Sequence, residues 1–219
     1  MDPSFSVIHS FPPPTLEARW REFLVGAEAP SQYNAPEFFL EPYWEGKRPF
    51  AVLALEGDRV TGVLTGIHEG NQVLSGLGVR PQIFIGNPEN SAAALRSLAA
   101  GMLSEAGSDP LLTVYTWEWL PLKPLQKYGF RPRALTGDVV LDLTKGTEQL
   151  FKELDKKRRN NIRYATKHGV EVSRATTIEE FRTYYQIYLG WCKRKNLAPF
   201  PQEMEEKAFL QCSRNRLLY

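Results

Sequence analysis

The chain has 219 residues, of which 42% are hydrophobic, 24% charged and 12% aromatic, and its formal net charge is +2. This length and composition are ordinary for a globular protein with one large or two small domains. No run of about 18 apolar residues is present, so we expect no membrane-spanning helix, and the N-terminus lacks the pattern of a signal peptide. Cys192 and Cys212 form no CxxC pair and the three histidines are scattered, so we expect reduced thiols, no metal site and a cytoplasmic location.

Charge is unevenly distributed along the chain. Residues 1–134 carry 11 Lys/Arg and 14 Asp/Glu, a net charge of −3, whereas residues 135–219 carry 16 and 11, a net charge of +5. Such asymmetry indicates two units with different surfaces, the second of which faces an anion.

The first part of the chain alternates between strand and helix patterns. In chain order we expect a strand (5–8), a helix (15–25), a short helix beginning at Pro36, strands (50–55, 60–67, 72–77, 83–85), a helix (91–106), a strand (111–117), a helix (121–128) and a strand beginning at Phe130. Glu56-Gly57-Asp58-Arg59 has the composition of a hairpin turn between two of these strands.

The second part begins with a new strand and is then mainly helical. We expect a strand (139–143), helices (147–154, 156–168), a strand (170–172), helices (178–194, 201–211) and a strand beginning at Arg216. Thr177 and Glu180 have the spacing of a capping box at the start of the helix at 178–194.

Several of these segments resemble acyltransferases. Leu125-Gln126-Lys127-Tyr128-Gly129-Phe130 resembles the late helix of the GNAT fold, which ends in Gly-Phe before a strand. The segment 157–170, KRRNNIRYATKHGV, is similar to the basic helix of the FemA/FemX-like (FemAB) peptidyltransferases, which are tandems of two GNAT units. The resemblance implies an α+β fold, a GNAT-like mixed sheet flanked by helices, with one complete unit (1–135) and the N-terminal part of a second (136–219).

The second unit would lack its central strands and its cofactor helix. We therefore expect the chain to be a fragment of a protein of roughly 330–380 residues, inactive by itself.

The resemblance implies transfer of an aminoacyl or acyl group to an amine of a phosphate-bearing cell-envelope precursor, as in peptidoglycan synthesis. The implied donor is an aminoacyl-tRNA, with no cofactor, and the partners are a small-molecule or lipid-linked precursor, tRNA and a peripheral membrane surface. The alternatives are an N-acetyltransferase that uses acetyl-CoA or another acyl-CoA, and a non-catalytic GNAT-like binding module. Residues 86–91 contain a single glycine where CoA-binding units have a Gly-rich turn, and Leu125 replaces a frequent tyrosine. The first unit is therefore not expected to bind acyl-CoA in the usual way.

The basic helix supplies the main candidate site. Seven basic residues lie between Lys152 and Lys167, and Arg159 and Arg163 share a face because they are four residues apart. Two guanidinium groups on one face suit bidentate phosphate contacts. We expect Arg159, Arg163, Lys157 and Lys167 to bind substrate, the alternative being a solvated surface helix.

A second group of candidates precedes the first hairpin. Tyr33, Trp44 and Lys47 border the acceptor groove in the resembling fold, where an aromatic wall beside a cation would suit a sugar phosphate; the alternative is that both rings are core residues. Glu118 is a candidate general base or simply an exposed charge. We assign no catalytic residue.

Overall fold

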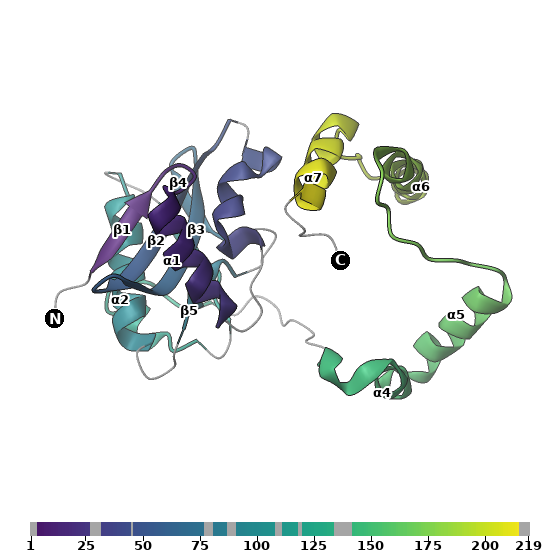
Figure 1. Cartoon of the computed structure of the whole chain (residues 1–219), viewed down its shortest axis with the longest axis horizontal. Coiled ribbons are helices and arrows are strands. Elements are labelled where there is room, and N and C mark those ends of the chain that lie inside the picture. The colour runs from purple at the N-terminus through teal and green to yellow at the C-terminus, as the bar shows by residue number, and fades with distance from the viewer. Residues whose placement is uncertain are drawn as a thin grey trace.

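The structure is a computed structural model that describes residues 4–26, 32–44, 46–76, 81–86, 91–107, 111–117, 120–133 and 142–214. A mixed sheet with helices on both faces is followed by further α-helices, of which α4 (Gly146–Glu153) and α5 (Lys156–Lys167) project away from the sheet (Figure 1). The mixed α+β class expected from the sequence is confirmed.

Six strands make up the sheet. They are β1 (Phe5–Ile8), β2 (Arg48–Glu56), β3 (Arg59–Glu69), β4 (Gln72–Ser75), β5 (Ile83–Ile85) and β6 (Leu111–Val114). The order is β1-β2-β3-β4-β6, and β5 pairs with β3 beyond β4. The pair of β4 and β6 is parallel, whereas the other neighbouring strands are antiparallel.

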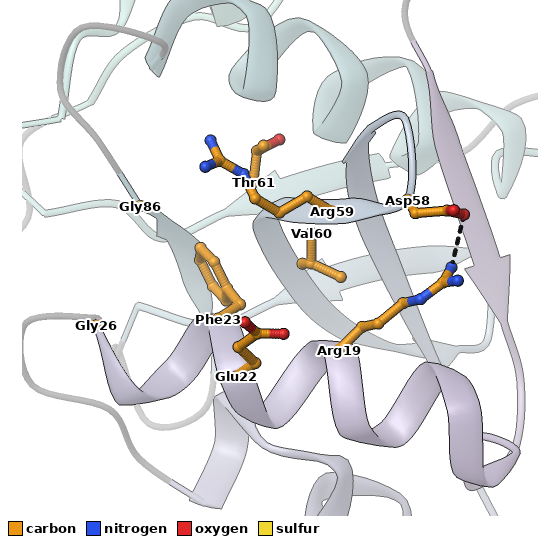
Figure 2. A pocket seen from close by; sticks show the side chains of 9 residues that line it. All are labelled: Arg19, Glu22, Phe23, Gly26, Asp58, Arg59, Val60, Thr61 and Gly86. Atoms are coloured by element: carbon orange, nitrogen blue, oxygen red, sulfur yellow. Dashed lines mark ion pairs between the residues drawn. The ribbon is translucent and has the colours of Figure 1, made fainter.

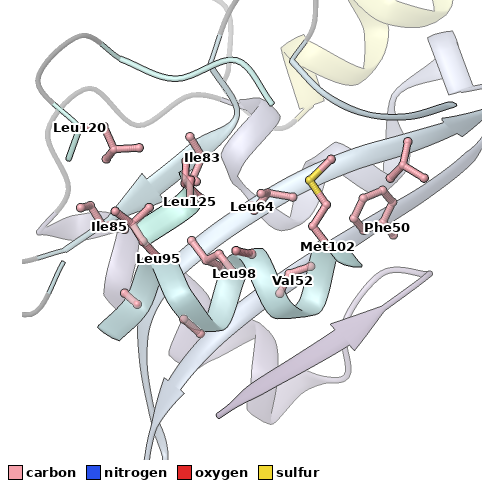
Figure 3. Packing of buried hydrophobic residues seen from close by; sticks show 14 residues of the cluster. Phe50, Val52, Leu64, Ile83, Ile85, Leu95, Leu98, Met102, Leu120 and Leu125 are labelled. Atoms are coloured by element: carbon pink, nitrogen blue, oxygen red, sulfur yellow. The ribbon is translucent and has the colours of Figure 1, made fainter. Parts of the chain in front are cut away.

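The central strand β2 is buried on both faces because each face is covered by a helix. Phe50 and Val52 point toward helix α2 (Ser91–Ser104), and Ala51 and Leu53 point toward helix α1 (Pro14–Val25). This alternation follows from the two-residue period of a strand. Figure 3 shows the α2 side of the core, where Leu95, Leu98 and Met102 pack against β2 and β3.

Helix α2 approaches the sheet closely at Gly101. A Cβ atom at this position would lie 2.3 Å from Cγ1 of Val52, so any residue other than glycine would require the Val52 side chain to shift. Gly57 in the β2–β3 turn has φ +59, a conformation that glycine adopts without steric cost.

Three short 3₁₀-helices connect α1 to β2: η1 (Gln32–Asn34), η2 (Pro36–Leu40) and η3 (Pro42–Trp44). Arg21 of α1 binds the buried Glu37 of η2 with Nη2 to Oε1 at 2.5 Å, and its Nε donates to Glu17 at 2.9 Å. These contacts fix the connection against α1. The N-cap of α1 is Pro13, so the helix begins one residue before the expected position 15.

After the sheet come α3 (Lys123–Gln126), η5 (Leu143–Lys145), α4 (Gly146–Glu153), α5 (Lys156–Lys167), α6 (Ile178–Lys195) and α7 (Gln202–Arg214). Helices α6 and α7 pack together through Phe181 and Phe209, whose ring centroids are 4.7 Å apart. Helix α7 also contacts the first part of the chain, because the Tyr43 hydroxyl of η3 donates to Glu205 Oε1 at 3.2 Å.

Two expected strands are absent where the structure describes the chain. Residues 130–133 and 170–172 are extended or irregular but unpaired, and Val170 and Val172 are 60% and 95% exposed. Their β-forming residues have no neighbouring strand to supply hydrogen bonds, and a lone extended segment is not stable as a strand. The strand expected at 139–143 lies outside the described residues up to position 141, and its last two residues are not strand, because η5 begins at Leu143. The strand expected from Arg216 lies outside the described residues.

Candidate functional site

The basic helix α5 is an exposed element whose N-terminus is capped. The Asp155 carboxylate accepts a hydrogen bond from the Arg158 backbone N–H at 2.9 Å, as an N-cap residue does. None of the α5 side chains is buried. The helix therefore exposes its charges to solvent. Its backbone lies away from the sheet (Figure 1).

Arg159 has a structural role at the corner between α4 and α5. Its Nη1 donates to the carbonyl oxygen of Lys152 at 2.8 Å and also to that of Leu154. These carbonyls belong to the last turn of α4 and to its C-cap residue, and they would otherwise lack a partner within the helix. A cation is also favourable at the negative C-terminal end of the α4 dipole.

Arg163 turns to the same side of α5. Its guanidinium lies over the ring of Phe151 in α4, 5.4 Å from the centroid, which is a cation–π geometry. Both arginines therefore hold α5 against α4. Phosphate binding by Arg159 and Arg163 stays a prediction.

The remaining charges of α5 are largely uncompensated. Among the described residues, α5 has a single ion pair with a carboxylate, between Arg158 and Asp155 at 3.9 Å. Lys157 and Lys167 are exposed and are not part of it. Because neither lysine forms an ion pair with a described carboxylate, both ammonium groups are available to an anionic ligand.

The structure places the second group of candidates in and beside a small core. Trp44 is 6% exposed, its Nε1 donates to the Phe38 carbonyl at 2.5 Å, and Tyr33 packs against the same cluster. Lys47 forms an ion pair with Glu69 at 3.2 Å. The rings therefore have a packing role, and substrate binding by Tyr33, Trp44 and Lys47 stays a prediction.

Two further residues considered from the sequence are Leu125 and Glu118. Leu125 is 5% exposed and belongs to the core between the sheet and α2. A hydrophobic residue at this position is thus explained by packing. Glu118 lies outside the described residues.

Comparison with known protein families bears on this helix directly. Residues 128–199 match the FemAB family. The FemAB-like assignment made from the sequence is confirmed for this segment, which covers 72 of the 219 residues. The match of this segment to the FemAB family supports an aminoacyl transfer activity in peptidoglycan-related processes. Comparisons with curated proteins and with solved structures gave no match.

The FemAB segment contains the whole of α4, α5 and α6, so the basic helix is central to it. No group of three His, Cys, Asp or Glu side chains in the described ranges is arranged to hold a metal ion. Each helix that the structure describes is too short or too polar to span a bilayer.

One cavity of about 600 Å³ lies outside the FemAB segment, between α1, the β2–β3 turn and the end of β5 (Figure 2). Arg19 and Asp58 form an ion pair at 3.0 Å on its wall, and Phe23, Val60 and Gly86 supply an apolar side. None of the candidate residues from the sequence lines it. The Arg19 guanidinium already has a carboxylate partner, and we assign no chemistry to this cavity.

A second cavity, of about 650 Å³, brings together residues that the sequence patterns did not indicate. Glu105 Oε2 accepts hydrogen bonds from His9 Nε2 at 2.8 Å and from His68 Nε2 at 2.9 Å. Burial opposes ionisation of Glu105, but the hydrogen bonds from both imidazoles outweigh it and hold the pKa of this carboxyl below its usual value. No local spacing could have revealed this cluster, because its members come from β3 and from just after β1 and α2.

Proposed function

We propose that the chain belongs to a FemX-like transferase that forms an amide on an amine of a phosphate-bearing cell-envelope precursor. The observation that carries the proposal is the match of the FemAB family to the segment containing α5. Within that segment the described side chains leave Lys157 and Lys167 without a carboxylate partner. An exposed cationic helix suits the phosphate groups of a nucleotide-linked or lipid-linked acceptor, or of tRNA.

The sheet supports a GNAT-like first unit in this proposal. Strands β4 and β6 are parallel neighbours up to Ser75 and Val114, after which β5 pairs with β3. In the part of the sheet that the structure describes, β5 pairs with β3 alone, and we infer an opening beyond Ser75 like that of GNAT sheets. We propose a first unit at residues 1–135 and the beginning of a second at 136–219.

The proposed reaction needs positioning more than acid or base groups. The acceptor amine attacks the ester carbonyl of an aminoacyl donor, the ester C–O bond breaks, and the proton lost by the amine leaves with the donor hydroxyl. Backbone donors would stabilise the oxyanion, and binding would align the two reactants. The proposed donor is an aminoacyl-tRNA in the cytoplasm, and no cofactor is required.

Calorimetric titration with three ligands tests the proposal: a UDP-linked muropeptide, total tRNA and acetyl-CoA. Binding of the muropeptide or tRNA is the expected result, with an affinity that falls as salt rises. Binding of acetyl-CoA alone would instead identify an acyl-CoA enzyme. Absence of binding by all three would reject the transferase for this chain.

Variants of α5 locate the contact. Lys157→Ala and Lys167→Ala should each lower the affinity for the anionic ligand by roughly tenfold or less, because each removes one charge. Each should also lower the salt dependence of that affinity. Lys207→Ala is the matched control, because Lys207 is an exposed lysine of α7 that pairs with Glu203 at 3.2 Å. Equal effects of all three would show that α5 has no special part in binding.

A further inference from the structure

The cavity beside Glu105 differs in chemistry from the basic helix because its wall carries both signs of charge. The lining residues that matter for its chemistry and its test are His9, Arg48, His68, Gly70, Glu105 and Gly107. Its volume of about 650 Å³ is in the range of small-molecule sites. Polar groups from β2, β3, β4 and the end of α2 converge there.

Glu105 supplies the negative side. Its side chain is only 12% exposed, and its lowered pKa keeps it ionised at neutral pH. Both imidazoles bind the same oxygen, Oε2, so Oε1 has no hydrogen-bond partner among the described residues. The carboxylate also follows the C-terminus of α2, where the helix dipole adds negative potential.

Arg48 supplies the positive side. It is the cross-strand partner of His68, so the two side chains leave the sheet on the same face, next to each other. Arg19, Arg21 and Arg59 of the same unit each have a carboxylate partner. Within the described residues no carboxylate pairs with Arg48, and its guanidinium is free to bind an oxyanion bidentately.

The histidines fix the arrangement. Because each imidazole donates its Nε2–H to Glu105, the Nδ1 atom of the neutral ring is an acceptor. His68 is itself only 12% exposed and lies against the Phe50 ring, with 5.2 Å between centroids. The carboxylate is thus held in place before any ligand arrives.

We propose that this cavity binds a small zwitterion of the amino-acid class, with its carboxylate on Arg48 and its ammonium on Glu105. A ligand with only one of these groups would leave either Arg48 or Glu105 without a partner of opposite charge. The proposal does not depend on the transferase function, because the cavity lies outside residues 128–199.

Heteronuclear NMR of the full chain tests this with glycine, acetate and methylamine as probes. Glycine should shift the imidazole signals of His9 and His68 and the backbone signals of Gly70 and Gly107. Acetate and methylamine should each bind about tenfold more weakly than glycine. Equal affinity of glycine and acetate, or no shift with glycine, would overturn the proposal.

Variants separate the two ends of the ligand. Arg48→Gln and Glu105→Gln should each lower the affinity for glycine by about tenfold, because each removes one charge-assisted contact. Arg59→Gln and Glu56→Gln are matched controls, because this pair is exposed on the β2–β3 hairpin and outside the cavity. If Glu105→Gln fails to fold, the Arg48 variant with the three probes decides alone: unchanged glycine affinity in it rejects the site.

Discussion

The hydroxyl of Tyr43 donates a hydrogen bond to Glu205, 162 positions later in the chain, at 3.2 Å. Burial raises the pKa of Tyr43, and the neighbouring Glu205 carboxylate raises it further. The protonated hydroxyl is therefore part of what joins η3 to α7.

Tyr43→Phe should lower the free energy of unfolding by about 0.5–1.5 kcal/mol, the net value of one such hydrogen bond. The pKa in the folded state lies above that in the unfolded state, so this contribution is complete below about pH 10 and is lost as pH rises further. Ultraviolet titration should find a late-ionising tyrosine that is missing from Tyr43→Phe. A titration unchanged by Tyr43→Phe would contradict the assignment.

Gly101→Ala should destabilise the protein although alanine is the better helix former. The added Cβ would meet Val52 Cγ1 at 2.3 Å, and overpacking costs about 1–3 kcal/mol, more than the gain in helix propensity. Urea unfolding measures the difference. Gly107→Ala is the control, because no atom lies within 4 Å of a Cβ there, and Gly101→Ala combined with Val52→Ala should suffer less from the clash.

Thr177→Ala should cost about 1 kcal/mol by removing the N-cap of α6. Thr177 Oγ1 accepts from the Glu180 N–H at 3.2 Å, and Glu180 Oε2 accepts from the Thr177 N–H at 3.1 Å. Urea unfolding monitored by circular dichroism measures the loss of stability. Thr177→Ser should retain most of the stability of the unchanged protein. Thr183→Ala, in the middle of the same helix, should have a smaller effect; an equal effect would argue against the capping box.

Glu206 should stay ionised to unusually low pH. Hydrogen bonds from Arg182 and Gln202 lower its pKa to about 2. The folded pKa lies below the unfolded value of about 4.3, so the stabilisation is present above that pH and is lost as pH falls toward 2. Carbon NMR of the carboxyl group measures this, and Arg182→Gln should return the pKa toward its usual value. An ordinary pKa in the unchanged protein would show that the pair does not persist in solution.

Local signals predicted much of the fold. The hairpin around Gly57, helix α2 and the Thr177–Glu180 capping box were predicted because each depends on residues within one turn or one element. The prediction of a strand at residues 170–172 was wrong, because β-forming residues make a strand only when a neighbouring strand pairs with them.

Long-range and backbone contacts could not be predicted in this way. His9 and Glu105 are 96 positions apart, and nothing near either residue indicates the other. Arg159 was selected for its charge, yet it contacts carbonyl oxygens of α4, which have no signature in the sequence. Trp44 was weighed as a ligand contact or a core residue, and its burial became evident only once η2 and η3 were placed around it.

Arg159 contacts the last turn of α4. The direction in which α5 leaves α4, seen along the α4 axis, therefore depends on the length of α4. A single residue inserted into α4 would rotate α5 by about 100°, whereas four inserted residues would rotate it by only about 40° while moving it about 6 Å along the axis. The number of residues in α4 therefore sets the direction in which the lysines of α5 point. Insertions in α4 would change that direction while leaving every charged residue in place.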